Sequence, residues 1–595
     1  MSTMRRDTTP PTARHAADID LRGRHVYMVG IGGCGMSGLA RLMRARGAIV
    51  SGSDMAASAT TAALIGEGIP VGFEQTAEAI PEPCDLIVAS AAIRPDHPQW
   101  LGAEGRGIRV MLYAEALGAC MAGQTGVAIA GTHGKSTTTA MLGAALVDAG
   151  LDPSVIVGAT CGQLAGGCFG RGSGGTGFRL GAAAIPAGPR AEQPGLLLAE
   201  ACEFNRSFHN LRPVVACITS VEADHLDVYA SLEDLVGAFR DFAALLPSQR
   251  AGGHLLIAHD GAHRREVSAG LECAVETIGF APEADWVVRW DPRTRDVEVL
   301  RHGATVAQWR SPIIGQHNAM NAATALALGT ILGADPARLA ASLAAFRGVD
   351  RRMQLLGEVR DSAWPDELAV RNGWHGCGVA QPCDEPASNE RTRSGDMAVP
   401  SHSHATLLDG GSHDAACDGT GDGPLPATRV RVIDDYGHHP TEIDATLRAL
   451  RLADRPERRF GASGLPGRLI CVFQPHQHSR TRHLLEEFAT SFEQADIVIV
   501  PHIYFVRDSQ AEKARVSAGD LVDRLRQRGV NAMHLYPFEA IVEHLQNLCR
   551  PGDTLCVMGA GPVNEVAHGY IAAMRRREGA GRRGGARAEV VGVGT

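Results

Sequence analysis

Residues 131–136 read Gly-Thr-His-Gly-Lys-Ser and have the residue types that bind a nucleotide phosphate. They follow an apolar run, 126–130, that is typical of a buried strand, and a helical pattern then continues to Val147. In such a unit the main-chain N–H groups and the helix N-terminus face a phosphate, while the lysine reaches the terminal phosphates and the hydroxyl ligates Mg²⁺. We therefore predict a nucleotide-phosphate site, in a loop that is shorter than the usual phosphate-loop pattern.

The alternative is an ordinary glycine turn with a surface lysine. Lysine is rare in this chain, since Lys135 and Lys513 are the only two among 57 basic residues. A chain that otherwise uses arginine places a lysine at the point where a phosphate would bind. Three threonines, 137–139, follow at the start of the helix, where hydroxyl groups suit anion contact. Both features favour the phosphate site.

Acidic and imidazole side chains follow two further strands, predicted at 195–199 and 214–219. The first is followed by Glu200 and Glu203, and the second by Glu222, Asp224 and His225. Open parallel sheets bind ligands at the carboxyl ends of their strands, and Mg²⁺ prefers a few carboxylates together with substrate phosphates. The sequence therefore favours a magnesium site, although solvated loop charge would explain either group alone.

Two further motifs have more than one interpretation. Gly30, Gly32 and Gly35 match G-x-G-x-x-G, with Asp54 at the end of the next strand, which indicates either a diphosphate site or a tight strand-to-helix turn. Asn318 and Asn321 share one helix face and suit a nucleotide, but Asn318 could equally cap the helix.

The last third of the chain has two polar loops at predicted strand ends. Residues 434–440 follow a strand at 430–433, and residues 474–481 follow a strand at 469–473. Their aspartates, histidines and arginine are the donors and acceptors that a substrate site requires. We therefore expect a second set of site residues here.

Strand, glycine turn and helix alternate along most of the 595 residues, which predicts an α/β fold with open, mostly parallel sheets. We expect an N-terminal domain over 21–124, a central domain over 125–347 and a C-terminal domain over 348–576. Residues 166–194 are expected to form a loop, 361–428 a disordered insertion and 577–595 a disordered tail, because these stretches lack apolar periodicity.

Composition excludes several classes. The net charge of −9 is unlike that of a general nucleic-acid binder, and no apolar run reaches the ~18 residues of a membrane-spanning helix. The 14 cysteines are spread through apolar segments, as expected of reduced buried thiols. The N-terminal Arg5 and Arg6 precede polar sequence and not an apolar signal region. These features predict a cytoplasmic protein.

Together the motifs resemble the Mur ligase family, from about Arg24 to about Ala572. The resemblance is carried by residues 30–40, 51–54, 131–142, 200–208, 222–227, 315–325, 348–354, 434–442, 473–481 and 557–562. It implies three domains: an N-terminal Rossmann-like domain for a UDP-sugar, a central P-loop ATPase domain and a C-terminal Rossmann-like domain that closes over the site. Residues 30–40 and 434–442 resemble the alanine-adding branch of the family. This resemblance implies ATP-dependent ligation of L-alanine to UDP-N-acetylmuramate, with Mg²⁺ as cofactor. It also implies a monomer or a homodimer.

The resemblance also implies roles for individual residues. The implied catalytic residues are Lys135, Glu203, His225, Arg352 and Asp435. ATP is expected at Gly131, Thr132, His133, Gly134, Lys135, Ser136, Thr137, Asn318 and Asn321, and Mg²⁺ at Ser136, Glu203 and His225. The UDP-sugar is expected at Gly32, Gly33, Cys34, Gly35, Ser53 and Asp54. Substrate contact and domain closure are expected of Tyr436, His438, His439, His476 and Arg480.

Three alternatives remain open at this point. A related ligase that attaches a peptide instead of alanine would share the phosphate loop and the chemistry. An NAD-dependent oxidoreductase would use the first glycine motif, but it leaves Lys135, Glu203 and His225 unexplained. A catalytically silent regulator is disfavoured by the intact set of polar site residues.

Overall fold

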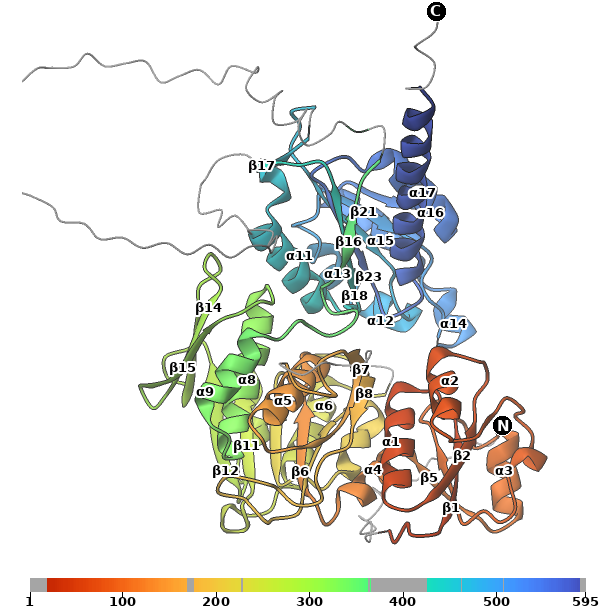
Figure 1. Ribbon diagram of the computed structural model, residues 1–595, viewed down its shortest axis with the longest axis vertical. Coiled ribbons are helices and arrows are strands. Elements are labelled where there is room, and N and C mark those ends of the chain that lie inside the picture. Colours follow the sequence, from red (N-terminus) through yellow and green to blue (C-terminus); the bar gives the residue numbers. More distant parts are fainter. Residues whose placement is uncertain are drawn as a thin grey trace, which may run out of the picture.

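Three sheets carry the fold, and helices cover their faces (Figure 1). The structure is a computed structural model and describes residues 19–168, 176–225, 228–361, 364, 425–461, 463–506 and 508–588. In Figure 1 the units built on the first two sheets lie side by side, and the unit built on the third lies above them. The α/β prediction with mostly parallel sheets is confirmed.

The first sheet has five parallel strands in the order β3-β2-β1-β4-β5. Its strands are β1 (His25–Val29), β2 (Ile49–Ser53), β3 (Val71–Gly72), β4 (Leu86–Ala89) and β5 (Arg109–Leu112). Its helices are α1 (Cys34–Ala45), α2 (Ala59–Gly66), α3 (Pro98–Gly105) and α4 (Tyr113–Met121). The first glycine motif therefore forms the turn from β1 into α1.

The central sheet has ten strands in the order β15-β14-β13-β12-β11-β10-β6-β9-β7-β8. Its strands are β6 (Thr125–Ala130), β7 (Ser154–Cys161), β8 (Thr176–Arg179), β9 (Leu196–Glu200), β10 (Val215–Ile218), β11 (His254–Ala258), β12 (Ala274–Gly279), β13 (Trp286–Trp290), β14 (Asp296–Arg301) and β15 (Ala304–Arg310). Its helices are α5 (Lys135–Asp148), α6 (Leu232–Ala243), α7 (Arg264–Ser268), α8 (Gln316–Ile331) and α9 (Pro336–Ala344). The strands from β13 to β7 run parallel, and β8, β14 and β15 run antiparallel to their neighbours.

The third sheet has six strands in the order β16-β18-β23-β20-β21-β22, parallel except for β16. Its strands are β16 (Gln354–Val359), β18 (Val430–Asp435), β20 (Leu469–Phe473), β21 (Ile497–Val500), β22 (Ala532–His534) and β23 (Thr554–Met558). Its helices are α11 (Pro440–Asp454), α12 (His478–His483), α13 (Leu485–Thr490), α14 (Gln510–Lys513), α15 (Ala518–Gln527), α16 (Phe538–Leu548) and α17 (Asn564–Ala588). None of the described helices combines the length and the apolar character needed to cross a bilayer.

Three sequence predictions need correction. Within the predicted loop 166–194, Thr176–Arg179 forms β8, because it pairs with β7 across the chain; residues 169–175 lie outside the described part. Most of the predicted insertion 361–428 is also outside it, but Leu425–Pro426 forms β17 beside β19 (Arg459–Phe460). Helix α17 continues to Ala588, so the predicted tail is wrong over 577–588.

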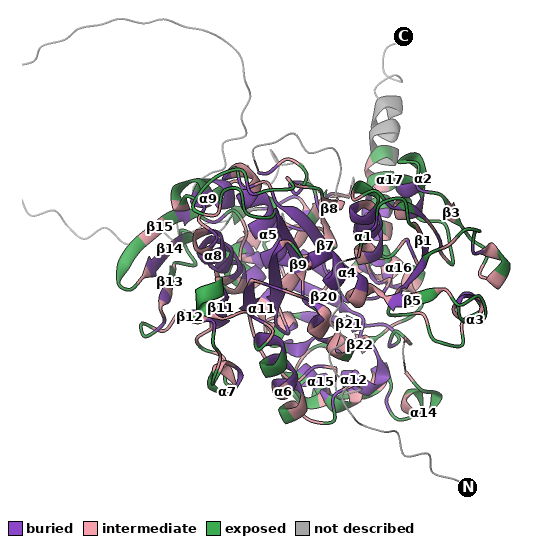
Figure 2. Cartoon of the chain, turned by 90° about the horizontal axis from the view of Figure 1, so that it is seen from below, coloured by how far each residue is buried: buried purple, intermediate pink, exposed green. Residues whose placement is uncertain are grey.

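Buried apolar side chains join the first two sheets. Strand β6 is buried along its whole length, as Figure 2 shows for the central strands, and alternate residues pack on opposite faces. Val127 and Ile129 face one core, while Ala128 and Ala130 belong to a second core that also contains Met28 of the first sheet. The N-terminal and central units are therefore joined by a shared apolar core. The cysteines among the described residues are all free thiols.

A substitution at Gly118 tests the close packing between the N-terminal and central units. It lies within α4, and a Cβ at this position would overlap the main-chain oxygen of Asn210 in the central unit. We expect Gly118→Ala to lower the free energy of unfolding by about 1–3 kcal/mol, the usual cost of overpacking. Gly237→Ala is the matched control, because Gly237 lies within α6 with open space around it, and there alanine should stabilise by up to about 1 kcal/mol. Thermal unfolding checks both, and equal midpoints for the two variants would contradict the close contact.

Candidate active site

A cleft of about 710 Å³ lies where the carboxyl ends of the central strands face the third unit. Most of the residues singled out from the sequence line this one cleft. From the central unit these are Thr132, His133, Gly134, Lys135, Ser136, Thr137, Glu203, His225, Asn318 and Asn321. From the connecting segment and the third unit they are Arg352, Asp435, Tyr436 and His438, and Cys34 reaches the cleft from the first unit.

The phosphate loop begins where β6 ends and leads into α5 at Lys135. Gly134 has a left-handed backbone (φ +82°), and a Cβ there would lie 2.5 Å from Oδ1 of Asn321, so only glycine fits. The main-chain N–H of His133 donates to Oγ of Ser220 (3.0 Å), and that of Thr132 donates to the Ser220 carbonyl (3.0 Å). The loop after β10 therefore holds the phosphate loop in place, with the N-terminus of a 14-residue helix behind it.

Lys135 is paired with Glu203 inside the cleft. Its Nζ lies 2.8 Å from Oε2 and 3.1 Å from Oε1 of Glu203, and it also donates to the carbonyl of Thr132 (3.1 Å). Burial alone would lower the pKa of Lys135, but the charge and hydrogen bonding of Glu203, together with the smaller effects of Cys202 and Glu200, outweigh it and raise that pKa. Glu203 is only 1% exposed. The lysine is therefore charged and paired with a buried carboxylate inside the cleft.

The predicted magnesium ligands Glu203 and His225 are brought together, and Ser136 lines the same cleft. Ligand atoms of Glu203, Asp224 and His225 all lie within 4.8 Å of one another, with His225 Nε2 3.7 Å from Glu203 Oε1. The ring of Phe204 packs edge-on against the His225 imidazole, with centroids 5.2 Å apart. The Glu203 carboxylate and the Ser136 hydroxyl offer the oxygen ligands that Mg²⁺ prefers together with phosphates, and the His225 imidazole lies beside the carboxylate.

Asp224 belongs to the acidic group predicted near a magnesium site but was given no individual role, and it forms a buried bridge to the third unit. Its Oδ1 accepts from Nε (3.0 Å) and Nη2 (2.7 Å) of Arg480, and both side chains are less than 10% exposed. Burial opposes ionisation of Asp224, but the guanidinium of Arg480 holds the pKa of that carboxyl well below its usual range. The predicted closure residue Arg480 thus acts on the loop that carries His225.

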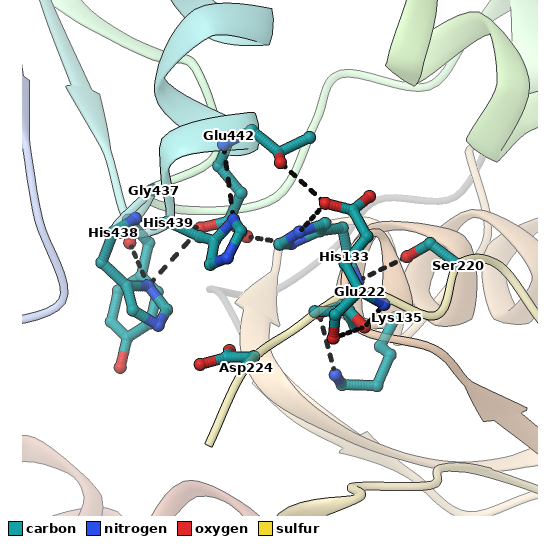
Figure 3. A network of polar contacts seen from close by, with 12 residues as sticks. His133, Lys135, Ser220, Glu222, Asp224, Gly437, His438, His439 and Glu442 are labelled. Carbon is teal, nitrogen blue, oxygen red and sulfur yellow. Dashed lines mark hydrogen bonds and ion pairs between the residues drawn. The ribbon is translucent and has the colours of Figure 1, made fainter. Parts of the chain in front are cut away.

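His133 makes a second charged contact across the same boundary (Figure 3). Its Nε2 lies 3.4 Å from Oε2 of Glu222, and its Nδ1 lies 3.3 Å from Oε1 of Glu442 on α11. Thr441 donates to Glu222 (2.7 Å), and the His439 ring lies 4.8 Å from the His133 ring. Burial would lower the pKa of His133, but the two carboxylates outweigh it and raise that pKa to about 9.

Ligand atoms of His133, Glu222 and His439 also lie within 4.8 Å of one another. The nitrogens of His439 are already used, since Nε2 contacts the Ala223 carbonyl (3.2 Å) and Nδ1 accepts from the N–H of Thr441 (3.3 Å). The imidazole of His133, the other histidine of the group, is protonated because its pKa is raised to about 9. In this structure the group forms a polar contact between the central and third units.

Asp435 and Arg352 lie where the central unit passes into the third. Asp435 is 4% exposed and accepts from the main-chain N–H groups of Met353 (2.7 Å) and Gly437 (2.6 Å). Burial raises the pKa of Asp435 to about 6, against the opposing charge of Arg352. The Arg352 guanidinium lies 5.1 Å from the centre of the Tyr436 ring. The predicted pair therefore shares one corner of the cleft with Tyr436.

The two asparagines are buried beside the phosphate loop. Nδ2 of Asn318 donates to the Ile314 carbonyl (2.9 Å), and Oδ1 of Asn321 accepts from the Thr138 hydroxyl (3.3 Å). The alternative that Asn318 caps a helix is wrong, because Gly315 is the cap of α8 and Asn318 lies inside it. Both side chains face the cleft from α8.

The remaining predicted residues divide into two groups. The rings of Tyr436, His438 and His476 follow one another at 5.6 Å and 5.7 Å along the wall of the third unit. Burial lowers the pKa of His438 to about 4, so this ring is a neutral donor or acceptor.

In the first unit, Gly33 and Gly35 belong to the turn from β1 into α1, and the N–H of Gly32 donates to Asp54 (2.7 Å). Ser53 does not face a ligand. Its hydroxyl donates to Gln99 (2.8 Å), and the residue is fully buried.

The sequence matches three family models. They are described as "Mur ligase family, catalytic domain" over residues 25–125, "Mur ligase middle domain" over 129–329 and "Mur ligase, glutamate ligase domain" over 425–561. Each matched segment includes most of the strands of one of the three sheets.

Similar proteins span almost the whole chain. A UDP-N-acetylmuramate–L-alanine ligase of Kineococcus radiotolerans is 34% identical over 94% of this chain and 98% of its own length. A protein of the same name from Pelotomaculum thermopropionicum is 33% identical over 91% and 95%.

Two solved structures share the fold. They are a UDP-N-acetylmuramate-alanine ligase of Thermotoga maritima (TM-score 0.63, 21% identity) and a murein peptide ligase of Psychrobacter arcticus (TM-score 0.60, 20% identity). Each covers 93% of this chain and 99% of the other.

The charge on His133 predicts a pH dependence. A histidine whose folded pKa is raised stabilises fully below its unfolded pKa of about 6.5, and the contribution is lost as pH rises through about 9. The groups that face His133 are Glu222, Glu442 and His439. The shift corresponds to stabilisation on the order of 3 kcal/mol at pH 6.5.

We therefore expect His133→Gln to lower the thermal midpoint at pH 6.5 and to differ little from the parent protein near pH 10. His263→Gln, at a histidine beside Glu266 on the central unit, is the control and should show no such convergence. A difference between parent and His133→Gln that stays constant over this pH range would contradict a charged His133.

Proposed function

Because the chain belongs to the Mur ligase family, we propose that it ligates L-alanine to the lactyl carboxylate of UDP-N-acetylmuramate at the expense of ATP. The protein is a ligase, and relatives that share about a third of its residues over nearly the whole chain carry this activity in their names. The observation that carries the proposal is the buried Lys135–Glu203 pair at the start of α5, in a cleft that the third unit covers. A nucleotide-using enzyme with reduced thiols also fits the cytoplasm.

The proposed reaction has two steps. A carboxylate oxygen of the muramate attacks the terminal phosphorus of ATP, the bond to the bridging oxygen breaks, and ADP leaves. The nitrogen of L-alanine then attacks the acyl carbon, loses a proton and expels inorganic phosphate, which leaves an amide. Such phosphoryl transfer depends chiefly on positioning and on neutralising charge.

The residues of the cleft suit these steps. Lys135 can exchange Glu203 for the transferring phosphate without a change in its own charge state. Glu203, His225 and Ser136 would hold Mg²⁺, which neutralises phosphate charge when bound. Asn318 and Asn321 face the same side of the cleft as the phosphate loop, where the nucleotide would lie. Arg352 and Asp435 approach from the third unit, as residues that complete the site on closure should.

The wall of the third unit suits the amino-acid substrate. Tyr436, His438 and His476 form a continuous polar and aromatic surface. The first unit would bind the UDP group at the N-terminus of α1, through Cys34 and Gly35. The N–H groups of Gly32 and Gly33 already donate to Asp54 and to the Gly30 carbonyl. Ser53 is left out of this assignment because its hydroxyl is bound to Gln99.

The proposal is tested by measuring phosphate release with UDP-N-acetylmuramate, ATP and Mg²⁺. L-alanine, glycine, L-serine and a tripeptide are compared as acceptors. The proposal requires the highest kcat/KM with L-alanine. Turnover that depends on the tripeptide would instead indicate a peptide-adding ligase, and an absence of turnover with every acceptor would reject the proposed function.

Lys135→Ala should remain folded and lose activity by about 100- to 1,000-fold, because a methyl group cannot offset the charge on the transferred phosphate. Lys513→Ala is the matched control, since Lys513 is the chain's only other lysine and lies on α14 beside the Phe505 ring. We expect the control to keep its activity in the phosphate-release assay. Unchanged turnover in Lys135→Ala would overturn the assignment of the ATP site.

Glu203→Gln and His225→Ala should each raise the Mg²⁺ concentration needed for the half-maximal rate, because each removes one proposed ligand. Glu266→Gln, an exposed carboxylate of the central unit, should leave that concentration unchanged. The measurement is the initial rate as a function of Mg²⁺ at saturating ATP. If both site variants kept the parent's metal dependence, the metal assignment would be wrong even if the ligase activity were present.

A further inference from the structure

Glu442 lies at the start of α11, where its two carboxylate oxygens have different partners. Oε2 accepts from the main-chain N–H groups of His438 (2.9 Å) and His439 (3.3 Å). This is the reciprocal contact of a capping box, since His439 is the N-cap residue and Glu442 stands three positions later. Oε2 therefore stabilises the start of its own helix.

The other oxygen faces cations from two distant parts of the chain. Oε1 lies 3.3 Å from Nδ1 of His133 in the phosphate loop and 3.7 Å from Nη1 of Arg352. Arg352 belongs to the segment that connects α9 to β16, and so joins the central unit to the third. Figure 3 shows the Glu442 and His133 side chains pointing toward one another across the boundary between these units.

The environment of Glu442 keeps it ionised. Its side chain is 16% exposed, and burial alone would raise its pKa. The hydrogen bond and charge of His133, together with the charge of Arg352, outweigh burial and hold the pKa of Glu442 well below its usual value. A partly buried carboxylate that faces two cations is costly to separate from them, because each partner would be left partly buried without its counter-charge.

We propose that Glu442 is a positioning residue that couples the phosphate loop to domain closure, with Oε1 holding His133 and Arg352 in the arrangement in which the third unit covers the loop. Its kinetic consequence rests on the proposed ligase function, whereas its effect on closure does not. Glu442 touches no substrate in this role and acts through the two cations. A role confined to the helix cap is the alternative that the experiment must exclude.

Glu442→Gln separates the two roles. Glutamine can still accept the capping hydrogen bonds at the third helical position, so the start of α11 should be kept, while the negative charge toward His133 and Arg352 is lost. Asp444→Asn is the matched control, because Asp444 lies two residues later on α11 in a solvent-exposed pair with Arg448 (2.9 Å). Both substitutions replace one carboxylate by its amide on the same helix.

The experiment compares the full-length parent protein with Glu442→Gln, His133→Gln, the double variant and Asp444→Asn. Small-angle X-ray scattering without nucleotide measures closure independently of activity. We expect Glu442→Gln and His133→Gln to increase the radius of gyration, and Asp444→Asn to match the parent. His133→Gln approaches the same contact from the other side, so the scattering result does not depend on one variant.

Phosphate release gives the second readout. We expect Glu442→Gln to lower kcat/KM for ATP by about 10- to 100-fold, the loss expected for one hydrogen bond to a charged group. Both substitutions remove the His133–Glu442 contact, so the loss in the double variant should be smaller than the product of the two single losses.

Multiplying effects of the two substitutions would overturn the proposal, as would a Glu442→Gln protein that matches Asp444→Asn in both readouts. A parent protein without ligase activity would reject the proposed function, and the scattering comparison would still decide the closure contact.

Discussion

A charged side chain that leaves water must find an opposite charge or a set of hydrogen bonds, and this constraint explains how the cleft is arranged. Lys135 is held by Glu203, Asp224 by Arg480, and His133 lies between Glu222 and Glu442. Each pair brings together segments that are far apart in the chain. The same contacts therefore organise the phosphate loop and dock the third unit over it.

The two boundaries between units differ in chemistry. The first and second sheets share a continuous apolar core, which resists separation because it excludes water. The contacts of the third unit over the cleft are ion pairs and hydrogen bonds, whose energies depend on charge and can be exchanged for those of a charged ligand. A nucleotide and a metal ion carry the charges for such an exchange. This arrangement suits an enzyme that must admit ligands and then enclose them.

Local sequence was sufficient to predict several of the strands and helices and the position of the phosphate loop. Strand β20 has the predicted bounds, because it is a short apolar run between polar turns. The edge strand β8 was missed, since its pairing with β7 depends on tertiary contact and its flanks are rich in glycine. The helix over 577–588 was missed for a related reason: Val566, Tyr570 and Met574 anchor its earlier turns against the third sheet, and the arginine-rich segment continues them.

The structure brings together the predicted residues Lys135, Glu203 and His225, for which residue type and strand position coincide. The Asp224–Arg480 bridge joins residues 256 positions apart and left no local signal. Glu442 did leave one, because it stands three residues after the N-cap His439, but that spacing reports only its capping role. Ser53 is a polar residue at a strand end whose hydroxyl donates to Gln99 within the core, a contact that its sequence position did not indicate.

The most direct test of the central claim follows the oxygen atoms of the muramate carboxylate. With both oxygens labelled with oxygen-18, attack of the carboxylate on ATP transfers one label to the phosphorus and leaves the other in the amide product. Mass spectrometry of the released phosphate should then find one oxygen-18 atom per phosphate in an L-alanine-dependent reaction. Unlabelled phosphate would contradict the account, because the phosphoryl group would then have passed to water instead of the substrate.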